Sequence, residues 1–197
     1  MKKGLNVKDL INVGLFSVLS ILFTFVGGMI GFIPFLMPIV PLVAGILVGP
    51  VNMLFATKIK KVGMIAIQQT VMGLLFFATG HGIWSLLFAP IGIVIAEYIM
   101  KKGNYTSINH ARWAFSFATV SFVGNWIPVF FAREKYIKQL IDMGYGAEYA
   151  QKMMSVMPSW FFVPLILIGF IGMYIGCTIG IKILKKHFVK AGMIKDV

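Results

Sequence analysis

The sequence is poor in charge and especially poor in acid. Charged residues make up 12% of the 197 residues, and only 6 are aspartate or glutamate, against 18 lysines and arginines. An ordinary soluble domain carries about 25% charged residues. Together with 59% hydrophobic residues and a mean hydropathy of +0.90, this composition excludes an ordinary soluble domain. It predicts an all-α integral membrane protein that crosses the bilayer several times.

Residues that usually carry chemistry are also scarce. The single cysteine, Cys177, excludes an internal disulfide and a cysteine metal site. His81, His110 and His187 lie too far apart in the predicted topology to form one metal site. The chain has no paired carboxylates, no nucleophile elbow, no HExxH motif and no P-loop. We therefore expect no catalytic residue and no metal site, and a protein that is not an enzyme.

The apolar residues fall into runs that predict six transmembrane helices within a single domain, residues 1–197. The predicted helices cover residues 10–31, 35–57, 62–79, 84–100, 111–132 and 159–182. The third and fourth are short. Four prolines interrupt the entry to the second, at Pro34, Pro38, Pro41 and Pro50. Because irregular backbone at membrane depth needs protein or water around it, the 31–41 connection is expected to turn back toward the protein interior.

The basic residues predict the orientation. The net charge of +12 could indicate nucleic-acid binding, but the lysines stand in short clusters between apolar runs, so no nucleic-acid partner is expected. With both termini in the cytoplasm, 14 of the 18 basic residues face inward, as the positive-inside rule requires. These are Lys2, Lys3, Lys8, Lys58, Lys60, Lys61, Lys101, Lys102, Arg112, Lys182, Lys185, Lys186, Lys190 and Lys195.

The one long hydrophilic segment lies between the fifth and sixth predicted helices, on the outer side. Residues 133–158, REKYIKQLIDMGYGAEYAQKMMSVMP, show helical spacing of apolar residues on either side of GYG. They predict two short amphipathic helices. Such helices could rest on lipid headgroups or form a lid over an outer cavity. The methionines favour the lid, since flexible thioether side chains adapt to what they cover.

Aromatic and amide side chains gather in the outer half and predict a small-molecule site. The candidate substrate-binding residues are His81 in the turn TGHGIWS, Trp84, Asn125, Trp126, Trp160 and, deeper, Gln68. Alternatives remain open: the tryptophans could form an interfacial aromatic belt, His81 could be a turn residue in water, and Gln68 or Gln69 could link helices. Since no acid lies there, a neutral to mildly anionic ligand is expected. Tryptophans beside Asn125 favour a flat heteroaromatic one.

Small residues four apart form stripes on the predicted helices. Gly172, Gly176 and Gly180 share one face of the sixth helix. That face could pack against the protein's own helices or dock another membrane subunit, with Gly14 and Ser17 of the first helix as companions to a docking face. Glu97 is the one acid within a predicted helix. Its spacing from Lys101 predicts a local i,i+4 ion pair.

Four segments carry a resemblance to a known family. They are LNVKDLINVGLFSVL, GFIPFLMPIVPLVAGILVGPVNMLFATKIKKVGM, TGHG and the basic tail after the sixth helix. With them the chain resembles the S components of energy-coupling factor (ECF) transporters, in particular the MptD-like or Trep_Strep group. The resemblance implies a substrate-binding subunit in the bacterial cell membrane that captures a vitamin or related micronutrient outside the cell. It would then associate with a transmembrane coupling subunit and two ATP-binding cassette ATPases.

The resemblance further implies that ATP is used by the partner subunits and that this chain holds no cofactor of its own. It places substrate contacts in the first outer loop, Phe32 to Met37, and in the outer parts of helices three to six. Docking in the family typically uses small residues four apart in the first helix, whereas Gly14 is followed here by Val18. The alternatives are a self-sufficient small secondary transporter or channel, for which Glu97 would be the coupling acid, and a membrane enzyme acting on lipid.

Overall fold

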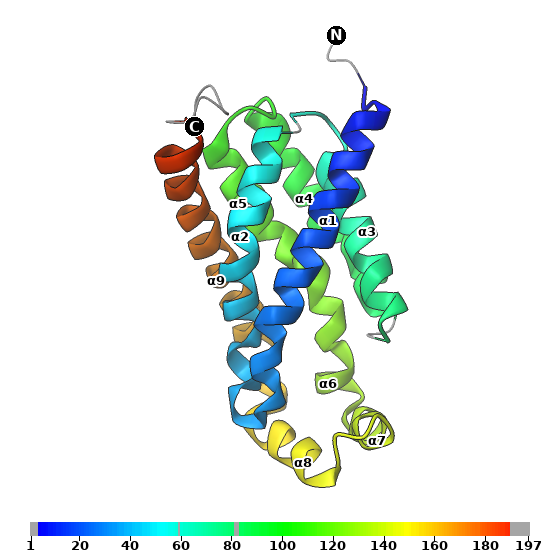
Figure 1. The fold of residues 1–197 in the computed structure, drawn as a ribbon. Helices are drawn as coiled ribbons and strands as arrows, with labels where there is room; N and C mark the ends of the chain where they lie inside the picture. Colours follow the sequence, from blue (N-terminus) through cyan, green and yellow to red (C-terminus); the bar gives the residue numbers. More distant parts are fainter. Residues whose placement is uncertain (1–3, 59, 81–82, 190–197) are drawn as a thin grey trace.

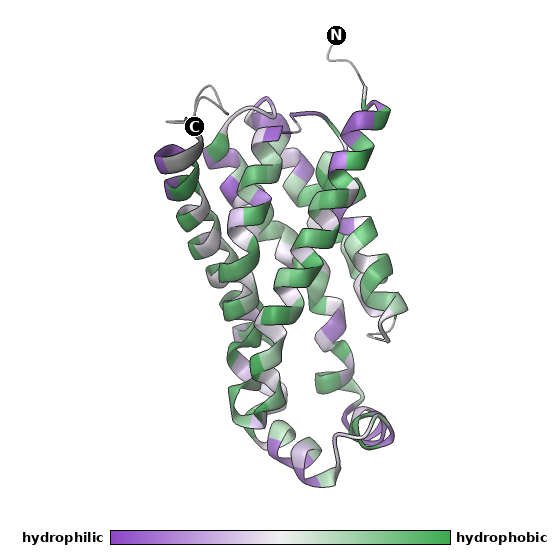
Figure 2. Ribbon diagram, viewed as in Figure 1, coloured by the Kyte–Doolittle hydropathy of each residue, from purple (hydrophilic) through white to green (hydrophobic). Residues whose placement is uncertain are grey.

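The protein is a bundle of helices, as the sequence predicts. The computed structural model describes residues 4–58, 60–80 and 83–189, and every regular element within these ranges is a helix. The start of α1 and the end of α9 lie at one end of the bundle, called here the terminal end. The short helices α7 and α8 lie across the opposite, capped end (Figure 1). Hydrophobic residues cover the long helices, and hydrophilic residues gather at the terminal end and on α7 and α8 (Figure 2).

Five helical segments of the described chain are long and apolar enough to cross a membrane. They are α1 with η1 (Val7–Gly28, Met29–Phe32), η2 with α2 (Pro34–Ile39, Val40–Lys58), α4 (Trp84–Lys102), α5 with η3 and α6 (Ile108–Ala118, Thr119–Trp126, Ile127–Phe131), and η4 with α9 and η5 (Ser159–Phe161, Phe162–Ile183, Leu184–Val189). A further apolar helix, α3 (Met64–Ala78), has 15 residues. At about 22 Å it is shorter than a hydrocarbon core of about 30 Å. Five of the six predicted helices therefore reach spanning length.

Helices α2 and α9 touch backbone to backbone through their glycines. A Cβ added to Gly49 would lie 2.2 Å from the carbonyl carbon of Gly176, and one added to Gly176 would lie 2.4 Å from the carbonyl oxygen of Gly45. Gly172 and Gly180 meet the α2 backbone in the same way. The stripe on α9 is therefore an internal packing face. The docking role expected for these three α9 glycines is corrected, because α2 already occupies that face.

The other two predicted docking residues, Gly14 and Ser17, lie on α1 and differ in the space around them. Ser17 is fully buried, and its hydroxyl donates to the carbonyl of Val13 at 2.8 Å. It therefore cannot belong to an open docking face, which corrects that prediction. A Cβ added to Gly14 would meet nothing within 4 Å. Gly14 thus lies beside open space, and its docking role stays a prediction.

Glu97 belongs to a small network at the terminal end. Its carboxylate accepts the hydroxyl of Tyr105 at 2.9 Å and the backbone N–H of Ala66 at 3.3 Å. Ala66 lies in the first turn of α3, whose N–H groups have no partner within the helix. Glu97 thus caps α3 from a neighbouring helix. The predicted ion pair with Lys101 is wrong, because among the described residues the carboxylate takes these two donors instead.

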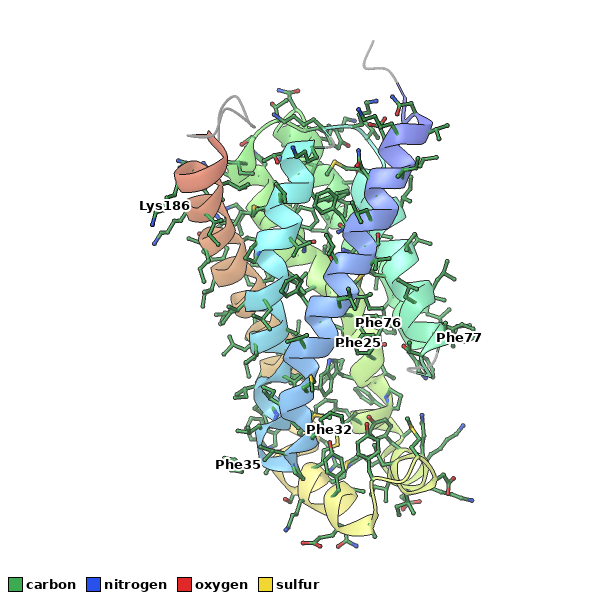
Figure 3. All side chains as sticks on the ribbon, viewed as in Figure 1. Phe25, Phe32, Phe35, Phe76, Phe77 and Lys186 are labelled. Carbon is green, nitrogen blue, oxygen red and sulfur yellow. The ribbon has the colours of Figure 1, made fainter. Side chains whose placement is uncertain are left out.

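The proline-rich connection folds into η1 and η2 at the capped end. Local bonds satisfy its backbone, from Ile33 N–H to the Ile30 carbonyl at 3.1 Å and from Leu36 N–H to the Ile33 carbonyl at 2.9 Å. Because the backbone is satisfied locally, the segment need not enter the protein. Phe35 is 75% exposed and points away from the bundle (Figure 3). The predicted turn toward the protein interior therefore holds only for the inner side of this segment, and Phe35 lies on its outer side.

The outer connection forms two short helices, as predicted. They are α7 (Arg133–Asp142) and α8 (Ala147–Val156). The Arg133 guanidinium donates to the carbonyls of Met157 and Met154 at 2.7 and 2.8 Å. A cation at a helix C-terminus stabilises its unpaired carbonyls and its dipole. The Tyr149 hydroxyl donates to the carbonyl of Gly31. The two helices are therefore fixed to each other and to η1 and do not lie loose on the surface.

Candidate ligand-binding cavity

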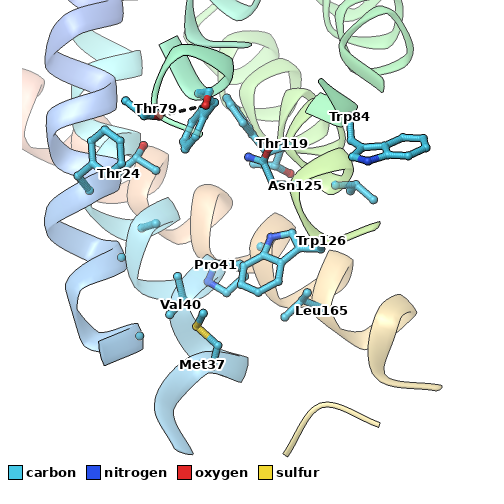
Figure 4. A pocket seen from close by; sticks show the side chains of 18 of the residues that line it. Thr24, Met37, Val40, Pro41, Thr79, Trp84, Thr119, Asn125, Trp126 and Leu165 are labelled. Carbon is cyan, nitrogen blue, oxygen red and sulfur yellow. Dashed lines mark hydrogen bonds between the residues drawn. The ribbon is translucent and has the colours of Figure 1, made fainter. Parts of the chain in front are cut away.

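A cavity of about 740 Å³ lies inside the bundle, next to α7 and α8. This volume falls within the range of about 300–1,000 Å³ that is typical of small-molecule sites. Its walls come from α1, α2, α3, η3 and α9, residues of α7 and α8 border its outer end, and Thr24, Pro41 and Trp126 are among the side chains that line it (Figure 4). The lining is mostly apolar, and its large side chains include Phe25, Phe76, Phe115, Phe122, Trp126, Tyr136, Met29, Met37, Met72, Met143 and Met173.

The break in the fifth long segment places two of the predicted site residues. Between α5 and α6 the chain forms the 3-10 helix η3, which ends at Trp126. A Cβ on Gly124 would lie 2.2 Å from the carbonyl oxygen of Trp84, and Ser121 donates to the carbonyl of Ala89 at 3.2 Å. These contacts fix η3 against α4. As a result Asn125 and Trp126 both line the cavity.

A polar cluster forms the deep part of the cavity. Gln68 Nε2 donates to Asn52 Oδ1 at 3.2 Å and to Ser20 Oγ at 3.4 Å, and Ser20 Oγ donates to Asn52 Oδ1 at 3.3 Å. Asn52 Nδ2 points at the sulfur of Met173, 3.6 Å away. Gln68 therefore links α3 to α1 and α2, which is the helix–helix role that the sequence left open for it.

Several amide oxygens of this cavity are buried without a partner. They are Gln68 Oε1, Gln69 Oε1 and Asn125 Oδ1. Gln68 is 1% and Gln69 5% exposed. A buried acceptor without a donor costs about 1–3 kcal/mol. Water or the N–H and O–H groups of a ligand would remove this cost, so the cavity is built to receive donors.

The cavity ends against an aromatic stack on its terminal-end side. Phe115 lines the cavity, its ring centroid lies 6.1 Å from that of Phe55, and Phe55 lies 5.6 Å from Phe16. All three side chains are buried. Gln68 stands only four residues into α3, about 6 Å from the start of that helix. The cavity thus reaches deep into the bundle, and this stack closes it there.

The electrostatics of the lining are close to neutral. Among the described lining residues the one charged side chain is Lys135, which is exposed on α7. Burial, followed by the nearby tyrosines Tyr149 and Tyr145, raises the pKa of Tyr136 to about 12. Burial also raises the pKa of Tyr149. Both hydroxyls are therefore neutral at physiological pH, and apart from Lys135 the described lining carries no acidic or basic side chain.

The structure divides the predicted site residues. Gln68, Asn125 and Trp126 lie together around the cavity. Trp84 lines its edge but is 42% exposed, and its indole points away from Asn125 and Trp126 (Figure 4). Trp160 is 71% exposed and does not line the cavity, so the structure does not bring it together with the other three, and its contact stays a prediction. His81 lies outside the described residues.

Sequence reasoning missed the partners of Gln68. Ser20 and Asn52 line the cavity and belong to helices read as apolar spans. The available signal was a polar side chain inside an apolar run, since such a group at membrane depth needs a partner or a function. Tyr136 and Tyr149 were assigned only to the outer surface, yet both line the cavity.

Fold and composition together define an α-helical integral membrane protein with an internal cavity. The family described as "Hypothetical bacterial integral membrane protein (Trep_Strep)" matches residues 7–190, and the chain belongs to this family. Comparison with curated proteins and with solved structures gave no match. The protein is thus an integral membrane protein of a bacterial family, which agrees with the Trep_Strep part of the resemblance.

Proposed function

We propose that the protein is an S component of an ECF-type importer. In this role it captures a micronutrient-like small molecule outside the cell and delivers it with a transmembrane coupling subunit and two ATPases. The observation that carries the proposal is the capped cavity of about 740 Å³, whose buried amide oxygens lack donors. The alternative of a self-sufficient transporter would need coupling chemistry in that cavity.

The distribution of basic residues supports the orientation that this role requires. At the terminal end and its loops lie Lys8, Lys58, Lys60, Lys61, Lys101, Lys102, Arg112, Lys182, Lys185 and Lys186. At the capped end lie Arg133, Lys135, Lys138 and Lys152. By the positive-inside rule the terminal end faces the cytoplasm and the cavity opens outside, in the plasma membrane. In this arrangement α3 is the sixth crossing, and its short length is accommodated by local thinning of the bilayer.

The place of Glu97 supports an energy source outside this chain. A proton-coupled carrier places an ionisable group on its substrate path. Glu97 does not line the cavity, and its carboxylate is engaged by Tyr105 and by the α3 backbone. No described acid lines the cavity in its place. The binding step therefore belongs to this chain, and the energy comes from its partners.

Co-purification tests the proposal. The tagged full-length protein is isolated from its own bacterial membranes, and the attached proteins are identified by mass spectrometry. We expect a coupling subunit and two ATPases, and we expect Gly14→Leu to remove them because Gly14 borders open space on α1. Ala78→Leu, at an exposed small residue of α3, is the matched control. Absence of any ATPase, together with uptake by the reconstituted chain alone that Glu97→Gln abolishes, would overturn the proposal in favour of the self-sufficient transporter.

A further inference from the structure

We propose that the deep end of the cavity is a subsite for an uncharged head group that donates hydrogen bonds. The acceptors are the carbonyl oxygens of Gln68 and Gln69, and the head group is a carboxamide or the amino-bearing edge of an aromatic ring. This inference names the substrate class of the same cavity and so rests on the proposed function.

The hydrogen bonds around Asn52 fix which end of the Gln68 amide is free. The Met173 thioether is a weak acceptor and no donor, so the nitrogen of Asn52 faces the sulfur and its oxygen faces Ser20 and Gln68. Gln68 must then present its nitrogen to Asn52 Oδ1. Its oxygen is left over, and it stands buried in the cavity wall without a donor.

Gln69 adds a second free acceptor in the same cavity. It follows Gln68 on α3, lines the same cavity, and its Oε1 is buried without a described donor. Because both residues line one cavity, a group with two N–H donors offers one donor for each oxygen. A primary carboxamide or an amino-substituted ring edge has that form.

The surrounding charges exclude an ionised head group. No described acid lines the cavity to compensate a buried cation, and free carbonyl oxygens repel an anion. Moving an unpaired ion out of water costs far more than moving a neutral amide that gains hydrogen bonds. The one charge of the described lining, Lys135, lies at the exposed outer part of the site, away from Gln68.

The walls beside the two glutamines favour a flat body over a polyol. Phe76 and Phe122 meet edge to face, with centroids 5.5 Å apart at 64°, and Phe115 forms the floor. Met72 and Met173 line the same cavity. Aromatic faces and thioethers pack well on a planar ring, whereas they leave the hydroxyl groups of a polyol without partners.

Three probes with the same ring and different head groups test the subsite. The purified full-length chain is titrated with benzamide, benzoate and benzylammonium at neutral pH, and binding is followed by the unfolding temperature and by tryptophan fluorescence. A ligand that binds the folded state raises the unfolding temperature. We expect benzamide to bind at least about tenfold more tightly than either ion, a difference of about 1.4 kcal/mol.

Substitutions of the two glutamines test whether benzamide binds at this subsite. Gln69→Met removes one acceptor at similar side-chain length and breaks no described hydrogen bond, so the protein should fold, and benzamide should bind about tenfold more weakly. Gln68→Met should act in the same direction but also unlinks Asn52 and Ser20. Gln151→Met is the matched control, since Gln151 is exposed on α8 and does not line the cavity.

Two outcomes would overturn the inference. The first is equal binding of the three probes, or benzamide binding that Gln69→Met leaves unchanged. The second is a higher unfolding temperature in sodium chloride than in choline chloride when no probe is present. That result would make the two oxygens a site for a monovalent cation. Because these measurements use the chain without its partners, they are independent of the co-purification. Associated ATPases together with failed probe selectivity would leave the S-component proposal standing and remove only the subsite.

Discussion

The cavity has two kinds of wall, and they are built in opposite ways. On one side α2 and α9 meet backbone to backbone at Gly45, Gly49, Gly172 and Gly176. On the other side α6, α7 and α8 are short helices joined by individual side-chain contacts, including the Arg133 bonds to α8 and the Tyr149 bond to Gly31. The first wall has almost no freedom to adjust. The second is held by contacts that can break one at a time.

This difference indicates where a ligand could enter. A glycine interface behaves as one rigid unit, because any displacement brings backbone atoms into collision. The capping helices pack inward through Met153 and Met154 of α8 and Met157 at its end, all of which are buried. Thioether side chains repack at low cost. Opening is therefore expected at the cap, with α2 and α9 as the fixed frame.

The largest expected effect comes from breaking the rigid wall with Gly49→Ala. The new Cβ would lie 2.2 to 2.6 Å from the backbone of Gly176 and Cys177, which cannot move aside as a flexible side chain would. We expect at least about 3 kcal/mol of destabilisation, measured by thermal unfolding in detergent. Gly14→Ala is the control, since its Cβ meets nothing within 4 Å and it should leave stability unchanged or slightly raised. An unaltered Gly49→Ala protein would contradict the account of the α2–α9 wall.

A smaller and local effect is expected when the cap is loosened with Arg133→Met. The change removes both hydrogen bonds to the last carbonyls of α8. Opening of α8 should become about 2 kcal/mol easier, seen as faster amide hydrogen exchange in α7 and α8 while α2 and α9 keep their protection. Lys138→Met, at an exposed position of α7, controls for loss of positive charge. Equal acceleration in α9 would show that cap and wall open together.

Alkaline pH should weaken the cap through Tyr136. Its pKa is raised to about 12 in the folded protein, mainly by burial, against about 10 in an unfolded chain. The stabilising contribution of the neutral hydroxyl is therefore complete below pH 10 and is lost as the pH rises toward 12, with about 1 kcal/mol gone at pH 11. Tyr136→Phe should flatten this part of the pH profile of the unfolding temperature. Identical profiles for the two proteins would remove Tyr136 as the cause.

The long helices could be predicted from the sequence because the length of each apolar run decides them, and α7 and α8 could be predicted from the helical spacing of their apolar residues. The fate of the glycine stripe could not, since Gly172, Gly176 and Gly180 present the same pattern whether the approaching helix is α2 or a partner. Glu97 was misread for a related reason. Sequence spacing offers Lys101 as a partner, whereas the folded chain brings Tyr105 and the first turn of α3 to the carboxylate.

Residues of the candidate site could be predicted from the sequence only where a single segment carried polar side chains at membrane depth. Gln68, Asn125 and Trp126 stood out in this way and line the cavity. Ser20 and Asn52 are single polar residues in two other helices, and only the packing of α1, α2 and α3 makes them one cluster. A sequence records which polar residue each helix carries but not which helices are neighbours.

The smallest effect, essentially none, is expected for Trp160→Ala, and it sharpens the boundary of the site. Trp160 is 71% exposed and its ring contacts Phe161, whereas Trp126 lines the cavity beside Pro41 and Leu165 (Figure 4). Benzamide should bind Trp160→Ala as tightly as the unchanged protein and should bind Trp126→Ala more weakly, because only the second change removes an aromatic wall. Fluorescence titration measures both, and the benzamide response of Trp126 should remain in Trp160→Ala. Weaker binding in Trp160→Ala would mean that the cap rearranges around the bound probe and brings η4 to the cavity, so the cap would be the more mobile of the two walls.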